Sequence, residues 1–260
     1  MKGSDRMVLA ILQARMSSTR LPGKVLKPIL GRPMLALHIE RVRRAAQLNT
    51  ILIATSTEVS DNPIAELCQQ EGIACHRGSL NDVLDRFYTA AKPYQPEHVV
   101  RLTGDCPLAD PAIIDQVVTN HIQGAFDYTS NCRPPTFPDG LDVEIFRFSV
   151  LEQAWKEGTK PYEREHVTPF IWQQPERFKL SNVTADKDLS QMRWTVDRAE
   201  DLAVVTEVYE SLYPKNPAFG FTDILNFIRQ HPEIQKMNDG FMRNEALAKE
   251  LQASTKTEQI

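Results

Sequence analysis

Residues 7–14 (MVLAILQA) form an apolar run, and this run limits what the chain can fold into more than any other feature. A strand with one face in water alternates polar and apolar residues, whereas an apolar run is typical of a strand buried on both faces of a parallel sheet. Similar runs follow at residues 50–54 and 98–103, with a shorter one at 72–75. We therefore expect a sheet that is buried on both faces.

Segments with helical spacing separate these runs. Leu35, Ile39 and Val42 lie on one stripe of a helix predicted over residues 34–46. Further helices are predicted from Asn62-Pro63 onward and over residues 81–91. Strands that alternate with helices at this spacing predict an α/β fold with a mostly parallel sheet and right-handed crossovers.

The pattern changes after about residue 125, where a proline-rich loop is expected. The segments predicted there are a loop at 131–140, a strand at 142–148, a helix at 161–172, strands at 178–183 and 193–196, and helices at 199–212 and 222–230, the last capped by Thr222. The final segment, 241–260, is polar and is expected to be a helical or frayed tail. No internal repeat interrupts the chain, so we expect a single domain over residues 1–240.

Composition excludes several classes of protein. The chain has 260 residues, of which 42% are hydrophobic and 25% charged, values that exclude a disordered, collagen-like or coiled-coil protein. A net charge of -4 argues against a nucleic-acid-binding protein. There is no apolar stretch of 18 residues and no signal peptide, so we expect a cytoplasmic protein without membrane insertion. The four cysteines form no CxxC pair and are expected to be reduced thiols.

The loop at residues 15–24 (RMSSTRLPGK) is the most informative segment for function. It follows the first strand, at the edge of the sheet where open α/β folds bind ligands. Arg15, Arg20 and Lys24 alternate there with hydroxyl groups and a glycine, a combination that suits a polyphosphate. The alternative is a solvated loop whose cations only aid solubility. Neither a GxxxxGK[ST] nor a GxGxxG pattern is present.

Two aspartates follow apolar strands further along the chain. Asp105 ends LTGD, and Asp197 ends RWTVD. Carboxylates at two strand ends can share one hard cation, and Mg²⁺ fits because it completes its octahedron with phosphate oxygens and water. The alternative is that each caps a helix, and Asp197 could cap the helix that starts near residue 199. The metal prediction depends on both aspartates occurring together with the basic loop.

These motifs resemble a known family. QARMSSTRLPGKVL followed by GRPMLALHIERV is similar to the signature of sugar-acid cytidylyltransferases, including 3-deoxy-manno-octulosonate and acylneuraminate cytidylyltransferases. The closer likeness is to spore-coat polysaccharide biosynthesis protein F, which shares patterns such as GSLNDVLDR, REHVTP and RWTVD. The resemblance covers roughly residues 7–230, with the motifs in the expected order.

The resemblance implies a Rossmann-like, mostly parallel sheet of the nucleotide-diphospho-sugar-transferase type. It also implies a small dimerisation or substrate arm and a homodimer. The implied reaction joins CMP from CTP to a sugar acid, releases pyrophosphate, requires Mg²⁺ and serves surface polysaccharide synthesis. The nucleotide-binding half would span about residues 7–125 and the sugar-binding half about 126–240.

The resemblance also assigns roles to residues of this chain. Arg15, Arg20 and Lys24 would hold the triphosphate, Asp105 and Asp197 would bind the metal, and Arg86 would lie on the nucleotide side. The predicted nucleotide-binding set is Ala14, Arg15, Ser17, Arg20, Lys24, Arg86 and Asp105; the predicted catalytic set is Arg15, Lys24, Asp105 and Asp197. Such a reaction depends on positioning and charge neutralisation, and needs no covalent catalysis.

Sugar selection is expected in the second half of the chain. Strand alternation would place Asp142 and Glu144 on one face, where they could contact hydroxyls or form an exposed polar face. Arg164 and His166 are alternative substrate ligands, since helical neighbours point about 100° apart. His166 could act as a general base or have a structural or substrate-binding role. The other histidines are expected to be structural and without partners.

One departure from the family pattern concerns the acceptor. The octulosonate enzymes carry QGDEP where this chain has TGDCP at residues 103–107, so the resemblance transfers to the nucleotide half more firmly than to the sugar. Three alternatives remain at this point: a nucleotidyltransferase that uses another NTP or a sugar phosphate, a glycosyltransferase on the same fold, and a non-catalytic nucleotide-binding scaffold. A glycosyltransferase would normally carry a DxD pair, and the chain has only DVE at 142–144.

Overall fold

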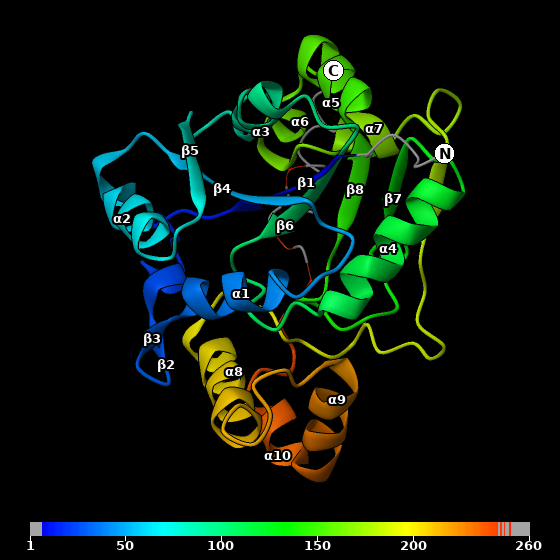
Figure 1. Ribbon diagram of the computed structural model, residues 1–260. Helices are drawn as coiled ribbons and strands as arrows, with labels where there is room; N and C mark the ends of the chain where they lie inside the picture. Colours follow the sequence, from blue (N-terminus) through cyan, green and yellow to red (C-terminus); the bar gives the residue numbers. More distant parts are fainter. Residues whose placement is uncertain (1–6, 244, 246, 248–249, 251–260) are drawn as a thin grey trace.

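The computed structural model describes residues 7–243, 245, 247 and 250, and its centre is a twisted seven-stranded sheet (Figure 1). The strands lie in the order β5-β4-β1-β6-β8-β7-β9. Only β8 runs antiparallel to its neighbours. The strands are β1 (Val8–Gln13), β4 (Thr50–Ser56), β5 (Ala74–Gly78), β6 (His98–Thr103), β7 (Tyr128–Ser130), β8 (Glu144–Arg147) and β9 (Leu180–Asn182), and a separate hairpin contains β2 (Pro28–Ile29) and β3 (Arg32–Pro33). The predicted α/β fold with a mostly parallel sheet is therefore confirmed.

Helices cover both faces of this sheet (Figure 1). The helices α1 and α4 lie on one face with α8, α9 and α10 beyond them, while α3, α5, α6 and α7 lie on the other. The helices are α1 (Met34–Val42), α2 (Asn62–Gln70), α3 (Val83–Ala91), α4 (Pro111–Gln123), α5 (Phe148–Glu157), α6 (Pro161–His166), α7 (Pro169–Trp172), α8 (Ala199–Leu212), α9 (Phe221–Gln230) and α10 (Pro232–Lys236).

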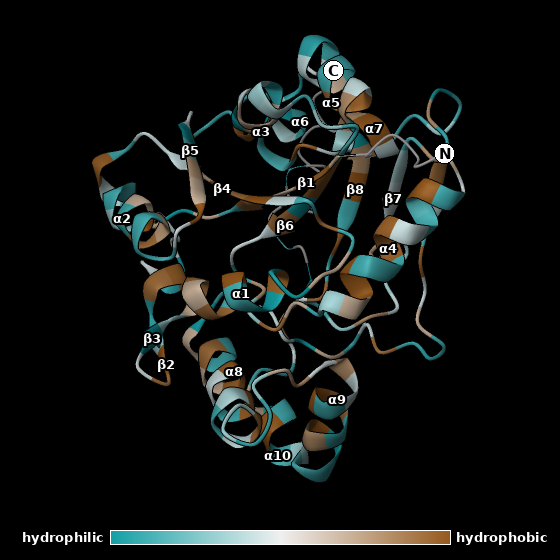
Figure 2. Cartoon of the chain, in the orientation of Figure 1, coloured by the Kyte–Doolittle hydropathy of each residue, from teal (hydrophilic) through white to brown (hydrophobic). Residues whose placement is uncertain are grey.

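The apolar run of β1 explains this layered arrangement. Val8, Ala10 and Leu12 pack into one hydrophobic cluster with α1, α4 and α8, and Leu9 and Ile11 pack into a second cluster with α3 and α5. Successive side chains of a strand point to opposite faces, so an apolar run is buried on both. In Figure 2 the central strands are correspondingly brown, and the outer faces of the helices are mostly teal.

Several element boundaries differ from those predicted. The first helix ends at Val42 instead of residue 46, and the third strand covers 74–78 instead of 72–75. The predicted strand at 142–148 is shorter, because α5 already begins at Phe148. The sequence reading missed α4, α5 and β7. The prediction that Thr222 caps α9 was wrong, because the N-cap residue is Gly220. The Gly220 N–H donates to the Asp223 carboxylate at 2.9 Å.

The helix predicted over 161–172 is broken in two. Val167 has a positive φ of 69°, and Pro169 starts the second piece as its first residue. Because proline cannot donate a helical hydrogen bond, the break at this point follows from the sequence.

None of the helices in the part of the chain that is described is long and apolar enough to cross a membrane.

Candidate active site

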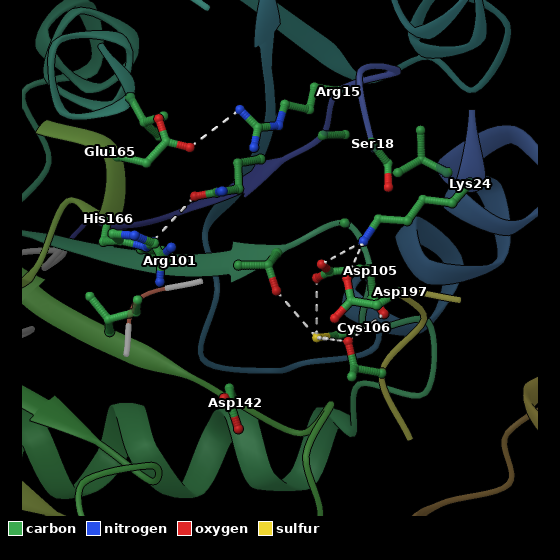
Figure 3. A pocket seen from close by; sticks show the side chains of 18 of the residues that line it. Arg15, Ser18, Lys24, Arg101, Asp105, Cys106, Asp142, Glu165, His166 and Asp197 are labelled. Atoms are coloured by element: carbon green, nitrogen blue, oxygen red, sulfur yellow. Dashed lines mark hydrogen bonds and ion pairs between the residues drawn. The ribbon is translucent and has the colours of Figure 1, made fainter. Parts of the chain in front are cut away.

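A cavity of about 380 Å³ opens beside the ends of β1 and β6, where the basic loop leaves the sheet (Figure 3). The structure brings nearly all predicted site residues to this cavity. Those that line it are Ala14, Arg15, Ser17, Arg20, Lys24, Arg86, Asp105, Asp142, Glu144, His166 and Asp197. Arg164 does not line it. The location agrees with the rule that open α/β sheets bind ligands at the carboxyl ends of their strands.

Lys24 joins the two aspartates that were predicted to bind metal (Figure 3). Its Nζ donates to Asp105 Oδ2 at 3.0 Å and to Asp197 Oδ1 at 2.8 Å. Burial favours the neutral amine, but the two carboxylates hold the pKa of Lys24 above its ordinary value. Burial would raise the pKa of both aspartates, yet the Lys24 ammonium keeps each pKa below its usual range. All three groups are therefore charged at neutral pH.

The approach of β6 to β1 positions Asp105. Gly104 donates its N–H to the Gln13 carbonyl at 2.7 Å, and a Cβ at Gly104 would lie only 2.8 Å from that same oxygen. A glycine is therefore needed for the turn that carries Asp105 into the cavity. On the other side, the Val196 N–H donates to the Asp105 carbonyl at 2.7 Å, which brings the segment of Asp197 alongside.

Asp197 is not a helix cap. The backbone N–H groups of Asp197 and Arg198 both donate to Asp201 Oδ2, at 2.9 and 3.0 Å, so Asp201 serves the start of α8. The buried Arg193 guanidinium binds Asp139, Asp197 and Asp201 together, at distances of 2.8–3.0 Å. The strand predicted at 193–196 was wrong, since only a single bridge from residue 139 to residue 193 forms there.

The donor set at Asp105 and Asp197 fits a hard divalent cation. Their carboxylate oxygens already converge on one positive charge, the Lys24 ammonium, within 3.0 Å. Among the described residues there is no group of three or more His, Cys, Asp or Glu side chains that could enclose a metal. Two carboxylates with the remaining positions left to phosphate and water match the coordination habits of Mg²⁺.

Asp61 holds the basic loop in place, and the sequence reading missed it. Its Oδ1 accepts the Met16 N–H at 2.8 Å, and its Oδ2 accepts from Thr55 and Ser56 at the end of β4. Burial would raise the pKa of Asp61, but these hydrogen bonds, led by that from the Ser56 hydroxyl, keep it below the usual value. The loop is thereby fastened to the sheet by an ionised side chain.

The two carboxylates that the sequence predicted to contact sugar hydroxyls, Asp142 and Glu144, are already paired with arginines. Glu144 is buried, forms an ion pair with Arg101 and accepts hydrogen bonds from Tyr128 at 2.5 Å and Thr168 at 2.7 Å. Asp142 precedes β8 and pairs with Arg243. Both side chains line the cavity, although only Glu144 belongs to the strand.

His166 and Arg164 have different positions. Burial, assisted by the nearby Arg101 cation, lowers the pKa of His166 to about 4, so its ring is neutral at pH 7. Arg164 turns away and donates to Asp82 Oδ2, which fastens α6 to the start of α3. Its neighbour Glu165 reaches the cavity instead and pairs with Arg15 at 3.3 Å (Figure 3).

Other lining residues were not predicted. They include Arg101, Thr103, Arg133, Asp139, Glu165 and Thr195. Arg101 had a signal in the sequence, because it is the only charged residue between Val99 and Thr103 in an otherwise apolar strand. Arg133 and Asp139 lie in the proline-rich loop, where no periodicity indicates direction.

The end of the chain contributes to the cavity wall. Within the segment predicted to be a polar tail, Glu245, Leu247 and Glu250 line the cavity, and the last ten residues lie outside the described part. Glu245 lies 3.8 Å from Arg20, and Glu250 lies 3.2 Å from His166.

The histidines expected to lack partners include a hydrogen-bonded pair. His121 Nε2 and His98 Nδ1 lie 3.1 Å apart, and His121 Nδ1 also bonds Thr129 at 3.1 Å. Their expected isolation was wrong, since they link α4 to two strands away from the cavity.

The chain matches the family model described as cytidylyltransferase over residues 9–250. It is 31% identical over 239 residues to spore coat polysaccharide biosynthesis protein SpsF of Bacillus subtilis, an alignment that covers 87% of this chain and 95% of the relative. It superimposes on a cytidylyltransferase from Leptospira borgpetersenii with a TM-score of 0.85 and 34% identity, covering 90% of this chain and 99% of the other.

A more distant structure shares the fold. It is the CMP:2-keto-3-deoxy-manno-octonic acid synthetase complexed with CTP, with a TM-score of 0.60, 18% identity and coverage of 78% and 98%.

Proposed function

Since the chain belongs to the cytidylyltransferase family, and is therefore a nucleotidyltransferase, we propose that it transfers CMP from CTP to a sugar acid with Mg²⁺. The observation that carries the proposal is the convergence of Lys24, Asp105 and Asp197 at one end of a cavity rich in arginine. CTP is supported by the ligand named for the distant synthetase, and the sugar acid by that enzyme's own name. The expected product serves surface polysaccharide synthesis, in line with the name of the Bacillus relative.

The reaction requires one bond to form and one to break. A hydroxyl oxygen of the acceptor attacks the α-phosphorus of CTP and forms a new O–P bond. The bond from that phosphorus to the oxygen bridging to the β-phosphate breaks, and pyrophosphate leaves with that oxygen and its electron pair. The hydroxyl proton passes to water or to a base in the cavity. Because no covalent enzyme intermediate is needed, positioning and charge neutralisation supply the catalysis.

Residues of the first half, about 7–125, would hold the nucleotide. Arg15, Arg20 and Arg86 would pair with phosphate oxygens, and Ala14 and Ser17 would line the nucleotide. Asp105 and Asp197 would hold Mg²⁺, which supplies neutralisation of the phosphate charge. The Lys24 ammonium, released from the carboxylates, would then face the phosphates as well.

Residues of the second half, about 126–240, would hold the acceptor. Asp142 lines the cavity and can accept hydrogen bonds from polyol hydroxyls. The neutral His166 ring can accept a proton or a hydrogen bond from the attacking hydroxyl at pH 7. Arg164 was predicted as a possible substrate ligand, but it is not part of this proposal. Its side chain pairs with Asp82 and does not line the cavity.

Calorimetric titration with CTP, UTP, ATP and GTP in the presence of Mg²⁺ tests the nucleotide half. We expect a clear preference for CTP, and preference for another nucleotide would refute the proposal. Pyrophosphate release with a panel of sugar acids then tests the acceptor half. Asp105→Asn and Asp197→Asn should each abolish Mg²⁺-dependent release, whereas the exposed control Asp186→Asn should not.

A further inference from the structure

The two carboxylate oxygens of Asp197 have different partners. Oδ1 accepts from the Lys24 ammonium at 2.8 Å, on the side where the cation would be bound. Oδ2 lies 3.0 Å from Arg193 Nη2 and 3.0 Å from Arg20 Nη2. A carboxylate oxygen has about two lone-pair sites, so these two guanidinium groups occupy Oδ2 fully. Asp197 therefore directs one oxygen, Oδ1, toward the cation position.

Arg20 and Arg193 differ in how firmly they are held. The Arg20 side chain is 37% exposed and belongs to the basic loop, and the proposed function assigns it to the triphosphate. The Arg193 side chain is 8% exposed and lies in the segment before α8. When the nucleotide draws Arg20 onto a phosphate, Arg193 is the guanidinium that stays on Oδ2 of Asp197.

Two further carboxylates fix the orientation of Arg193. Its Nε and Nη2 form a two-point pair with Asp201 Oδ1 and Oδ2, at 2.9 and 3.0 Å. Its Nη1 donates to Asp139 Oδ2 at 2.8 Å. A two-point pair between arginine and carboxylate fixes the plane of the guanidinium as well as its distance. The direction in which Nη2 points at Asp197 is thus set by Asp201 and Asp139.

Asp201 is itself held by the backbone and by the end of the chain. It is fully buried in the first turn of α8, and its Oδ2 also accepts the N–H groups of Asp197 and Arg198. The buried Asn238 amide donates to Asp201 Oδ1 at 2.9 Å and to the Arg193 carbonyl at 3.0 Å. Because these bonds act on both partners of the pair, Arg193 cannot follow Asp197 if that carboxylate rotates.

We propose that Arg193 is a positioning residue that restricts Asp197 to one metal-binding oxygen and thereby selects Mg²⁺ over Ca²⁺. The proposal rests on the proposed function, because it requires the cation to be held by Asp105 and Asp197. Mg²⁺ needs a nearly ideal octahedron, which a carboxylate meets with a single oxygen, whereas the larger Ca²⁺ takes more ligands and can use both oxygens of one carboxylate. Asp197 held by Arg193 offers the first kind of ligand and withholds the second.

The binding of CTP with each metal tests the proposal, since no CMP transfer occurs without an acceptor. CTP is titrated calorimetrically into the protein with saturating Mg²⁺ and, separately, with saturating Ca²⁺, and the ratio of the two Kd values is the readout. We expect wild type to bind CTP at least about tenfold more tightly with Mg²⁺ than with Ca²⁺. Arg193→Gln should reduce this ratio to less than about threefold, because Asp197 can then turn both oxygens toward the larger ion.

Two more variants separate positioning from a merely structural role. Arg193→Lys keeps the charge but not the fork of donors, so its ratio should lie between those of wild type and Arg193→Gln, and it decides the test if Arg193→Gln does not fold. Arg41→Gln is the matched control, because Arg41 is also buried and donates to the carbonyls of Ala109 and Phe219 at 2.8 and 2.9 Å. This control should lower the melting temperature and leave the ratio unchanged.

The proposal is overturned if wild type binds CTP equally well with the two metals, or if Arg193→Lys or a folded Arg193→Gln keeps the wild-type ratio. It is also overturned if Arg41→Gln lowers the ratio as much as Arg193→Gln, because general destabilisation would then account for the effect. Failure of the proposed function has a different signature: wild type would bind CTP with neither metal, or would bind it equally well in EDTA.

Discussion

Replacing Lys24 by methionine tests whether Asp105 and Asp197 form a shared cation site. Both bonded carboxylate oxygens lie within 3.0 Å of Nζ, so they are at most about 6 Å apart. At an effective dielectric constant of about 20, two unit charges at about 6 Å repel by about 3 kcal/mol. Lys24→Met keeps the length of the side chain and removes the charge, so the free energy of unfolding should fall by about 2 to 3 kcal/mol at neutral pH in EDTA.

Added Mg²⁺ should partly restore the stability of this variant. With a Kd of about 1 mM, 10 mM Mg²⁺ stabilises the folded state by about 1.4 kcal/mol. Wild type should gain less, because Lys24 must first leave the carboxylates. Urea unfolding with and without Mg²⁺ measures both effects, with Lys27→Met as the matched control outside the cavity.

Two results would refute this reasoning. One is a Lys24→Met variant that unfolds at the same urea concentration as wild type. The other is a variant that Mg²⁺ stabilises no more than it stabilises wild type. A double variant, Lys24→Met with Asp105→Asn, should recover stability in EDTA and lose the response to Mg²⁺, since the repulsion and the site disappear together.

Two further predictions concern stability. Burial lowers the pKa of His38 and of His121 to about 3, and that of His166 to about 4. Between pH 6.5 and 4 the unfolded chain binds these protons and the folded chain does not, so stability should fall as the pH falls. Burial raises the pKa of Asp139 to about 7, so near pH 5.5 the folded chain binds a proton there that the unfolded chain does not, which opposes this trend. The free energy of unfolding should therefore fall by about 2 kcal/mol for each pH unit of acidification near pH 5.5, as measured by urea unfolding. A pH-independent urea midpoint over this range would contradict the assignment. Gly140→Ala should destabilise by about 2 kcal/mol or more, because Gly140 has a φ of 108° and its Cβ would lie 2.5 Å from the Thr195 nitrogen; a calorimetric melt unchanged from wild type would show that the loop can relax.

The parts of the fold that the sequence predicted well are those with strong local signals. The apolar runs became β1, β4 and β6, and the amphipathic segment at 199–212 became α8 with the same bounds. The helix at 111–123 was missed although Pro111 marks its first residue and the Asp110 carboxylate caps it at 2.8 Å, a signal that the sequence carried.

Site residues could be predicted where they follow the end of a strand or belong to the basic loop. They could not be predicted where tertiary contacts determine which side chains reach the cavity. Asp105 follows β6 and Lys24 ends the loop that leaves β1, whereas Asp197 was grouped with them on a strand predicted at 193–196 that does not form. The position of Arg133 could not be predicted, because it depends on a loop whose path is fixed by β9 through Asn182. Whether Arg164 or Glu165 faces the cavity depends on a few tens of degrees in helix rotation, which sequence spacing does not determine.

The contact between Val196 and Asp105 limits how relatives of this protein can be recombined. A chimera that takes all residues after 125 from a relative keeps the Lys24 and Asp105 of this chain but takes the residue at position 197 from the relative. The charges that meet at this point then come from two different proteins. A chimera that exchanges only residues 126–183 keeps Lys24, Asp105 and Asp197 within one parent, and of the carboxylates bound by Arg193 only Asp139 comes from the other. If the second half holds the acceptor as proposed, such a chimera transfers acceptor preference and keeps the recipient's Lys24, Asp105 and Asp197.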